Sequence, residues 1–241
     1  MSILTYNVKG NSIKKDEYFG TRNHKILQFV KKQDPDIVVF QEFWNYGFVK
    51  YYMYPYRFVG YRSEISKSLQ FILSKYPIIK QGYIDFPNTL NNAMFVDIDY
   101  EGEVFRLYNI HLQSFNIKIA SELSDSKKAK SIFYKISNAQ NLRRNQVKLI
   151  QSHEKEFEGK TIFCGDFNST PFSSTYQILK GSRKDTYIEA GSGLGTTYSL
   201  IKYPLRLDYI LADKDFEVIS HQNFNINLSD HEPILARLDI N

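Results

Sequence analysis

Short runs of β-branched, aromatic and other apolar residues recur along the whole chain, with polar segments between them. Runs of this length and composition predict strands. Within residues 94–99 polar residues alternate with apolar ones, which places the polar residues on one face. Glu101 and Gly102 separate two runs and predict a tight hairpin. The predicted strands span residues 3–6, 36–40, 56–61, 69–73, 93–100, 104–110, 161–164, 207–211 and 233–240.

Two segments have the periodicity of helices with one buried face. The first spans residues 21–32, and Asp34-Pro35 is expected to end it. The second is more polar and spans about residues 121–158. Strands and helices alternate without a repeat or a Pro/Gly linker, which predicts one layered domain over residues 1–241. The buried stripe of the second helix is expected to contain Ile132, Phe133, Ile136, Ala139, Val147 and Ile150.

The composition excludes several classes of protein. Hydrophobic residues make up 42% and charged residues 24%, close to the globular average, so the chain is neither disordered nor a disulfide scaffold. The single cysteine, Cys164, lies in an apolar run and is expected to be buried rather than reactive. No apolar run is long enough to span a membrane, and the N-terminus lacks a signal-peptide pattern. We expect a soluble monomer, either cytoplasmic or tethered to a membrane through a longer parent chain.

Polar residues with reactive side chains lie at the ends of the predicted strands. In a mixed or antiparallel sheet the exit of one strand neighbours the entrance of another, so we predict that these side chains converge on one rim. Alone, each has an ordinary explanation as a turn residue, a solvated acid, a structural histidine or a cap. Together they are hard to explain as independent accidents. Asn7, Glu42, His111, Asp166 and Asn168 follow strands, and Asp208, Asp230 and His231 precede them.

This set of side chains suits the hydrolysis of a phosphate ester. The reaction requires an activated water and neutralisation of charge on the phosphoryl oxygens. A hard cation such as Mg²⁺ prefers carboxylate oxygens and keeps several waters, so one or two carboxylates suffice. We assign Glu42 as the first metal ligand and Asp230 as a candidate second one. Asp166 is suited to accept the proton of the attacking water or to orient it.

The amides and histidines of the set complete this chemistry. Asn7 and Asn168 can exchange hydrogen bonds beside a phosphate without adding negative charge. A protonated His231 offers a donor and a positive charge to the phosphoryl oxygens, and Asp208 is suited to hold its ring and favour the imidazolium. His111 is expected to stabilise the same phosphate from the other side.

The motifs that carry these residues are Thr5-Tyr6-Asn7, Gln41-Glu42, Asn109-Ile110-His111-Leu112, Gly165-Asp166-Phe167-Asn168, Leu207-Asp208-Tyr209 and Ser229-Asp230-His231-Glu232-Pro233. Their types and order resemble the endonuclease/exonuclease/phosphatase superfamily over almost the whole chain. The resemblance implies a DNase I-like fold of the α/β (α+β) class, a four-layer α/β/β/α sandwich of two packed mixed β-sheets. It also implies Mg²⁺-dependent cleavage of a phosphoester by in-line attack of water, with Mn²⁺ as a substitute ion.

The resemblance also implies roles for individual residues. Tyr6 departs from the family, since many members carry Trp there, and residues 68–77 lack a glycine common in the corresponding strand. Neither change removes a chemical group. Residues 165–171 resemble bacterial members whose catalytic domain follows transmembrane helices, which would fit a membrane tether. By this resemblance Glu42, Asp230 and Asn7 surround the metal, and the catalytic residues are Asp166, His231, His111, Asn168, Asp208 and Asn7.

Two features bear on the substrate. Lys and Arg outnumber acids over residues 118–148, which predicts contact with nucleic-acid phosphates or an anionic membrane, or simply a solvated helix face. An aromatic cluster over residues 44–54 predicts stacking on a base or sugar, contact with lipid, or core packing. The basic residues are Lys118, Lys127, Lys128, Lys130, Lys135, Arg143, Arg144 and Lys148, and the cluster is Trp44, Tyr46, Phe48, Tyr51, Tyr52, Met53 and Tyr54.

Three functions therefore remain open from the sequence. The first choice is a Mg²⁺-dependent phosphodiesterase acting on nucleic acid as an endo- or exonuclease, with which a net charge of +5 is compatible. The second applies the same chemistry to a phospholipid, a phosphoinositide or a small phosphate ester. The third is a non-catalytic binding module on the same fold, and the intact polar set argues against it.

Overall fold

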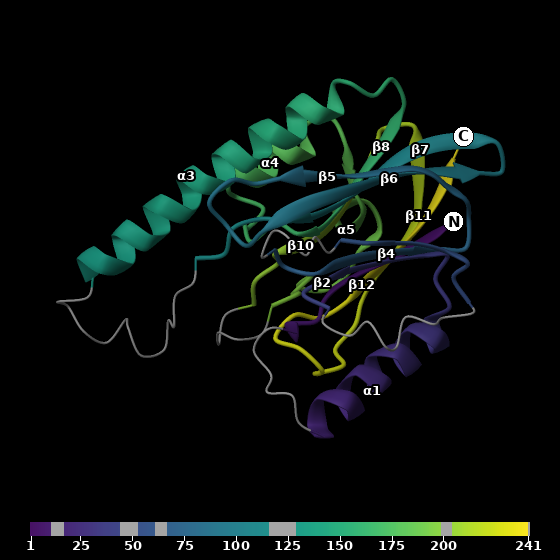
Figure 1. The fold of residues 1–241 in the computed structure, drawn as a ribbon, viewed down its shortest axis with the longest axis horizontal. Coiled ribbons are helices and arrows are strands. Elements are labelled where there is room, and N and C mark those ends of the chain that lie inside the picture. The colour runs from purple at the N-terminus through teal and green to yellow at the C-terminus, as the bar shows by residue number, and fades with distance from the viewer. Residues whose placement is uncertain (11–16, 44–52, 61–66, 116–128, 199–203, 241) are drawn as a thin grey trace.

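Two six-stranded β-sheets pack face to face in the computed structural model, which describes residues 1–10, 17–43, 53–60, 67–115, 129–198 and 204–240 (Figure 1). The first sheet has the strand order β11-β12-β1-β2-β4-β3, and the second has the order β5-β6-β7-β8-β10-β9. The first consists of β1 (Ser2–Asn7), β2 (Ile37–Gln41), β3 (Tyr56–Val59), β4 (Gln70–Ser74), β11 (Phe216–Asn223) and β12 (Ile234–Ile240). The second consists of β5 (Ile78–Asp85), β6 (Asn92–Tyr100), β7 (Glu103–His111), β8 (Lys160–Asp166), β9 (Lys184–Asp185) and β10 (Asp208–Ala212).

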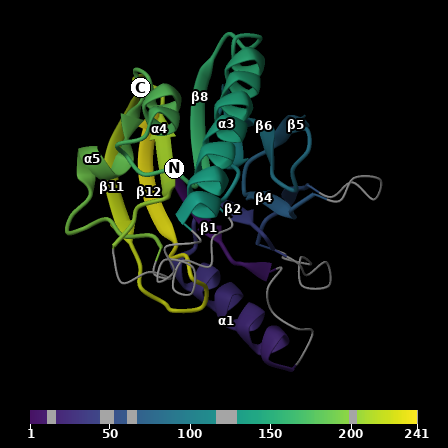
Figure 2. The same cartoon turned by 90° about the vertical axis from the view of Figure 1, so that its left-hand side faces the viewer.

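Helices cover the outer faces of the two sheets and give the fold four layers (Figures 1 and 2). One hydrophobic cluster fills the space between the sheets, with Ile72 from the first and Val96 from the second. A second cluster packs Val30 of α1 against the first sheet. A third packs Ile150 of α3 and Leu179 of α4 against the second sheet. The predicted α/β/β/α sandwich is therefore confirmed. The helices are α1 (Glu17–Gln33), α3 (Ala129–Glu154), α4 (Ser174–Lys180) and α5 (Thr186–Ala190).

Both sheets are mixed, as predicted. β1 runs parallel to β2, and β7 runs parallel to β8, whereas the other neighbouring strands described are antiparallel. β1 also pairs with β12, so the first and last strands lie side by side inside one sheet. The exits of β1 and β2 therefore share an edge with the entrance of β12, and the exits of β7 and β8 share an edge with the entrance of β10.

The strands that the sequence failed to predict include β5, β9 and β11. β5 and β11 form an edge of their sheets, and residues 79–81 of β5 are exposed. An edge strand needs fewer apolar residues because one side meets solvent, and charged residues there discourage pairing with other chains. β5 and β11 are therefore too polar to be recognised as strands in a search for apolar runs.

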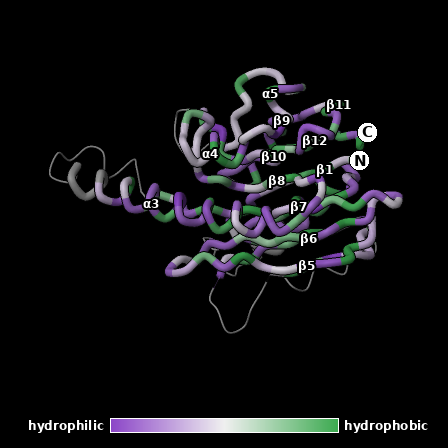
Figure 3. The backbone as a smooth tube through the Cα atoms, turned by 90° about the horizontal axis from the view of Figure 1, so that it is seen from above, coloured by the Kyte–Doolittle hydropathy of each residue, from purple (hydrophilic) through white to green (hydrophobic). Residues whose placement is uncertain are grey.

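The helices differ from their predicted bounds at the ends. α1 begins at Glu17 instead of residue 21, and it ends just before Asp34, whose φ of 46° is left-handed. α3 ends at Glu154 instead of residue 158. Residues 121–128 of that prediction lie outside the described residues, as do the side chains of Ile132 and Phe133. Of the predicted stripe, Ala139, Val147 and Ile150 are buried and Ile136 is half-buried. Figure 3 shows the N-terminal part of α3 extending beyond the sheets.

Two local predictions are confirmed. Glu101 and Gly102 form the turn between β6 and β7, both with positive φ. Cys164 is fully buried, and burial raises the pKa of its thiol, so it packs as a small apolar residue. Among the described residues, no helix combines the length and the apolar character needed to cross a bilayer.

Gly165 allows β8 to approach β7 closely just before Asp166. Its φ is +124°, and a Cβ atom there would lie 2.2 Å from the carbonyl oxygen of Ile110. Gly165→Ala is therefore expected to cost about 3 kcal/mol of unfolding free energy, from backbone strain and steric overlap together. Gly102→Ala is the matched control, because its φ is +96° but nothing lies within 4 Å of the added carbon. Urea unfolding of both variants tests this, and equal losses would contradict the steric argument.

Candidate active site

Three neighbouring strands of the second sheet place His111, Asp166 and Asp208 side by side. His111 ends β7, Asp166 ends β8, and the register pairs these two residues directly. Asp208 begins the antiparallel strand β10 and is also paired with Asp166. All three side chains are buried. The sheet register alone therefore assembles one histidine and two carboxylates.

The first sheet supplies the facing residues. Asn7 ends β1, Glu42 directly follows β2, and His231 lies just before β12. Asn7 Nδ2 donates to Asp166 Oδ2 at 3.0 Å, and His231 Nε2 lies 3.6 Å from the same oxygen. The rims of the two sheets thus meet at Asp166.

Asp166 is the most highly connected carboxylate of this group. Its Oδ1 accepts the backbone N–H of Asn168 at 2.8 Å, and its Oδ2 accepts the Asn168 side-chain amide at 3.0 Å. Burial raises the pKa of Asp166 to about 6, and Asp208 adds to the shift, while His231 and His111 oppose it. A carboxylate with a pKa near neutrality is suited to accept a proton.

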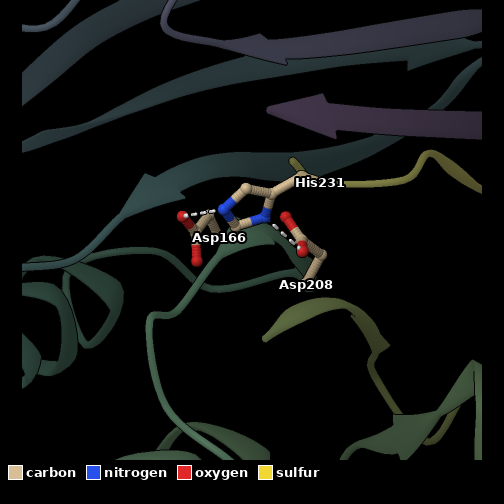
Figure 4. Close-up of side chains that lie close together, drawn as sticks. All are labelled: Asp166, Asp208 and His231. Carbon is tan, nitrogen blue, oxygen red and sulfur yellow. Dashed lines mark hydrogen bonds and ion pairs between the residues drawn. The ribbon is translucent and has the colours of Figure 1, made fainter. Parts of the chain in front are cut away.

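Asp208 holds His231 by a hydrogen bond of 2.8 Å between Oδ2 and Nδ1 (Figure 4). Burial alone would lower the pKa of His231, but the carboxylates of Asp208 and Asp166 outweigh it and raise the pKa to about 10. The ring is therefore an imidazolium at neutral pH, with Nε2 directed toward Asp166. The Tyr198 ring packs edge-on against it, with centroids 4.8 Å apart.

His111 has the opposite electrostatic character. Its Nε2 lies 3.7 Å from both Glu42 Oε1 and Asp166 Oδ2, and its Nδ1 has no hydrogen-bond partner among the described residues. Burial lowers the pKa of His111 and the nearby His231 adds to this, although Asp166 opposes it. The two histidines of the site therefore favour different protonation states.

Glu42 and Asp230 lie toward the solvent side of the group, with side chains 20% and 13% exposed. Burial raises the pKa of Glu42, while His231 and a hydrogen bond from Asn7 lower it. Asp230 forms an ion pair with Lys9. The amide nitrogen of Asn7 faces the carboxylates, and its oxygen accepts the Lys9 N–H at 3.0 Å. This orientation suits Asn7 as a donor, and a metal-ligand role would need the amide to turn.

The backbone is strained at three of the strand exits. Lys9, Glu42 and Asn168 have φ values of 48°, 55° and 47°, in the left-handed region that non-glycine residues rarely adopt. Such strain gathers at functional sites because the surrounding structure must hold it. It directs the loops after β1, β2 and β8 so that their side chains face the same space.

The donor set fits a divalent cation. Asp166, Asp208 and His231 offer ligand atoms that all lie within 4.8 Å of one another, and Asp208 Oδ1 is buried without a hydrogen-bond partner among the described residues. A protonated His231 cannot ligate a metal, so an ion between these three would have to displace its proton. The carboxylates of Glu42 and Asp230 carry no such restriction and are oxygen donors of the kind that Mg²⁺ prefers.

Arg143 was predicted as part of a basic surface, and this is wrong. Its side chain is 2% exposed and lies under α3, where it donates to the carbonyl oxygen of Asn168 at 2.6 Å. The spacing to Val147 and Ile150, four and seven residues later, is that of one helix face and was a signal for its burial. Arg144 and Lys148 are exposed, as a solvated face requires. Lys118, Lys127, Lys128 and the side chain of Lys130 lie outside the described residues.

Two further neighbours of the site, Thr197 and Tyr198 within residues 191–198, were not predicted from the sequence. Thr197 is buried, and its Oγ1 accepts the N–H groups of Leu207 and Asp208. Together with Tyr198 it holds Asp208 and His231 in place. No motif in the sequence distinguishes these residues. Of the aromatic cluster, Tyr54 is buried and donates its hydroxyl to Pro35, as core packing predicts, and Met53 is half-buried. The other members, Trp44, Tyr46, Phe48, Tyr51 and Tyr52, lie outside the described residues.

Solved structures of low sequence identity share this fold. D. rerio TDP2 in complex with a single-strand DNA product aligns with a TM-score of 0.73 and 18% identity, covering 99% of this chain and 98% of that one. The human Nocturnin catalytic domain with bound sulfate has a TM-score of 0.72 and 15% identity, with coverage of 100% and 94%. A mannosyl-6-phosphatase from Bacteroides thetaiotaomicron has a TM-score of 0.69 and 17% identity, with full coverage of both chains.

No curated protein matches the sequence. The description of a known family does match: residues 4–231 fit the Endonuclease/Exonuclease/phosphatase family, from the first strand to His231. Members of that family hydrolyse phosphoester bonds and in general depend on a divalent metal. The chain therefore belongs to the endonuclease/exonuclease/phosphatase family.

Proposed function

We propose that this protein is a Mg²⁺-dependent phosphodiesterase that hydrolyses nucleic acid by in-line attack of water. The observation that carries the proposal is the arrangement around Asp166, whose Oδ2 lies beside Asn7 and beside His231, the ring that Asp208 holds. This arrangement supports a proton acceptor and a cationic donor that act on one phosphate.

In the proposed reaction Asp166 takes a proton from the attacking water, and the resulting hydroxide forms the new bond to phosphorus. The bond between phosphorus and the leaving oxygen breaks, and that oxygen takes its proton from solvent. His231 stabilises the negative charge that develops on the phosphoryl oxygens, because it is held as an imidazolium by Asp208. Asn7, Asn168 and His111 fix the orientation of Asp166 and of the phosphate.

The carboxylates of Glu42 and Asp230 would hold the metal. When bound, Mg²⁺ neutralises phosphoryl charge and polarises the ester. For Asp230 to serve, Lys9 would have to release its ion pair with this carboxylate. Burial of Glu42 favours a bound cation, since the raised pKa reflects the cost of leaving its charge uncompensated.

Two observations favour nucleic acid as the substrate. Nucleic acid is favoured by the net charge of +5 and by the likeness to D. rerio TDP2, which was solved with a single-strand DNA product. A small phosphate ester is the second candidate, because a mannosyl-6-phosphatase shares the fold over its whole length. A phospholipid or phosphoinositide head group presents the same chemistry.

A substrate panel separates these candidates. It contains single- and double-stranded DNA, RNA, sphingomyelin, a phosphoinositide, mannose 6-phosphate and bis-p-nitrophenyl phosphate, each with Mg²⁺, with Mn²⁺ and with a chelator. We expect the highest kcat/KM on a nucleic acid and loss of activity under full chelation. A preference for a monoester or lipid would move the substrate to the second candidate. Activity that survives chelation would reject the role of the metal.

Glu42→Gln should raise the Mg²⁺ concentration needed for half-maximal rate by about tenfold and lower the maximal rate, because the neutral amide is a weaker ligand than a carboxylate. Binding of Mn²⁺ measured by calorimetry gives a second readout that does not depend on turnover. Glu217→Gln is the matched control, since Glu217 lies on β11 and is exposed. Wild-type affinity for Mn²⁺ in Glu42→Gln would contradict the assignment.

A further inference from the structure

Arg143 contributes a buried guanidinium to the underside of the site. Its Nη1 donates to two backbone carbonyls, those of Asn168 at 2.6 Å and Gln113 at 3.0 Å. The guanidinium carbon also lies 4.0 Å from the centre of the Phe115 ring. A single side-chain nitrogen of α3 thus connects the loop after β7 with the loop after β8. The two bonded residues, Gln113 and Asn168, are 55 positions apart in the sequence.

These two loops directly follow two strand-end residues proposed for catalysis, His111 and Asp166. Gln113 follows His111 by two positions, and Asn168 follows Asp166 by two positions. Asn168 donates both its backbone and its side-chain N–H groups to Asp166. The bond to the Asn168 carbonyl therefore restrains the residue whose preceding peptide N–H and side-chain amide orient the Asp166 carboxylate.

Other bonds from α3 and the neighbouring loop strengthen the same connection. Gln146, one turn beyond Arg143 on α3, accepts the N–H of Gln113 at 3.0 Å. The carbonyl of Leu112 accepts the Asn168 amide at 2.9 Å and that of Asn91 at 3.1 Å. The loops after β7 and β8 are thereby tied to each other and to α3.

Burying this cation is costly, which argues against a mere packing role. Burial lowers the pKa of Arg143 to about 10, and Asp166 opposes the shift, so the group stays charged at neutral pH. A well-packed apolar side chain of similar volume often replaces a buried ion without loss of stability. A guanidinium is explained better by the two carbonyls that it bridges than by the need to fill space.

We infer that Arg143 is a positioning residue for the phosphoesterase reaction: by holding the carbonyls of Asn168 and Gln113 it fixes the loops behind Asp166 and His111, and through Asn168 it orients the Asp166 carboxylate. The inference rests on the proposed function for its effect on turnover. Its structural part, the restraint on Asn168, is independent of that function and has its own readout.

The structural part is tested by amide hydrogen exchange in Arg143→Met and Arg144→Met. Both changes remove one cation from adjacent positions of α3, but Arg144 is exposed. Exchange of the Asn168 N–H, which donates to Asp166, should accelerate at least tenfold in Arg143→Met and stay within twofold of wild type in Arg144→Met. Unchanged exchange at Asn168 in Arg143→Met would overturn the inference, whatever the protein does to phosphate esters.

The catalytic part is tested by steady-state kinetics on the best substrate of the panel. A misplaced catalytic group costs up to about 100-fold in rate. We expect kcat to fall 10- to 100-fold in Arg143→Met with KM within twofold, and both constants to be unchanged in Arg144→Met. A wild-type kcat in Arg143→Met would overturn the inference alone, whereas an inactive wild-type protein would overturn the proposed function.

Chemical rescue guards against a variant that simply misfolds. Arg143→Ala leaves space for a free guanidinium ion, which should restore kcat at least fivefold and slow exchange at Asn168, whereas equal concentrations of ammonium or sodium should not. Arg143→Lys keeps the charge, but its nitrogen is one atom short of the Nη1 position, so only partial recovery is expected. Equal effects of guanidinium and sodium on folded Arg143→Ala would count against the bridging role.

Discussion

Replacing Asp166 with Asn should lower kcat by about 1,000-fold, within the range attributed to a positioned general base. The amide has the same shape but cannot take a proton from water. The remaining oxygen of Asn can still accept one N–H group, but the amide nitrogen cannot accept the other hydrogen bonds that Asp166 receives from Asn7 and Asn168. Steady-state kinetics on the best substrate measures the effect.

Stability should not explain that loss. Burial raises the pKa of Asp166 to about 6, which means that its charged form is disfavoured in the folded protein. A carboxyl group whose pKa is raised on folding destabilises the fold as pH rises from 3.8 through about 6. A neutral Asn removes that cost at pH 7, which offsets the hydrogen bonds that its amide nitrogen cannot accept, so the melting temperature should change little. Asp239→Asn, at an exposed position of β12, is the control for removal of a charge. Turnover of Asp166→Asn at a tenth of the wild-type rate or more would exclude Asp166 as the base.

Replacing His231 with Gln should lower kcat/KM by about 100- to 10,000-fold, because the phosphoryl oxygens lose a cationic donor. Gln retains a hydrogen-bonding side chain but carries no charge. His221→Gln is a matched control, since His221 lies on β11 and bonds Thr186 instead of a residue of the site. A loss of less than fivefold in His231→Gln would show that the imidazolium does not act on the phosphate.

The pH profile tests the same assignment through Asp208. The carboxylates raise the pKa of His231 to about 10, so wild-type activity should persist up to that pH and fall above it as the ring loses its proton. Asp208→Asn removes the carboxylate nearest to the ring, and the pKa of His231 should fall. The alkaline limb of kcat/KM should then begin at a lower pH. An alkaline limb that stays in place would assign it to another group.

Much of the site could be predicted from the sequence because it is built at strand ends. A residue that directly follows or precedes an apolar run lies at the end of a strand whatever the order of the strands, and His111, Asp166 and Asp208 were found in this way. These three residues lie close together because the strand register pairs both His111 and Asp208 with Asp166. The pattern did not reveal that register, and the family resemblance supplied the fold.

Residues that act through backbone groups gave a weaker signal. Arg143 donates to two backbone carbonyls. Because every residue has a backbone carbonyl, the residue types of these partners do not indicate the interaction. Thr197 likewise binds two backbone N–H groups. The edge strands β5 and β11 were missed for a related reason, because each pairs with one neighbouring strand and buries few side chains. To predict such features, one must know how the whole chain packs.

The pairing of β1 with β12 has a consequence for biosynthesis. During translation β1 leaves the ribosome long before its antiparallel neighbour β12 and His231, which lie far along the chain from it. Contacts between such distant positions form late and slow folding. A nascent or C-terminally truncated chain therefore lacks the imidazolium and half of the hydrogen bonding around β1. The proposed cleavage therefore requires that β12 has already joined β1 in the sheet.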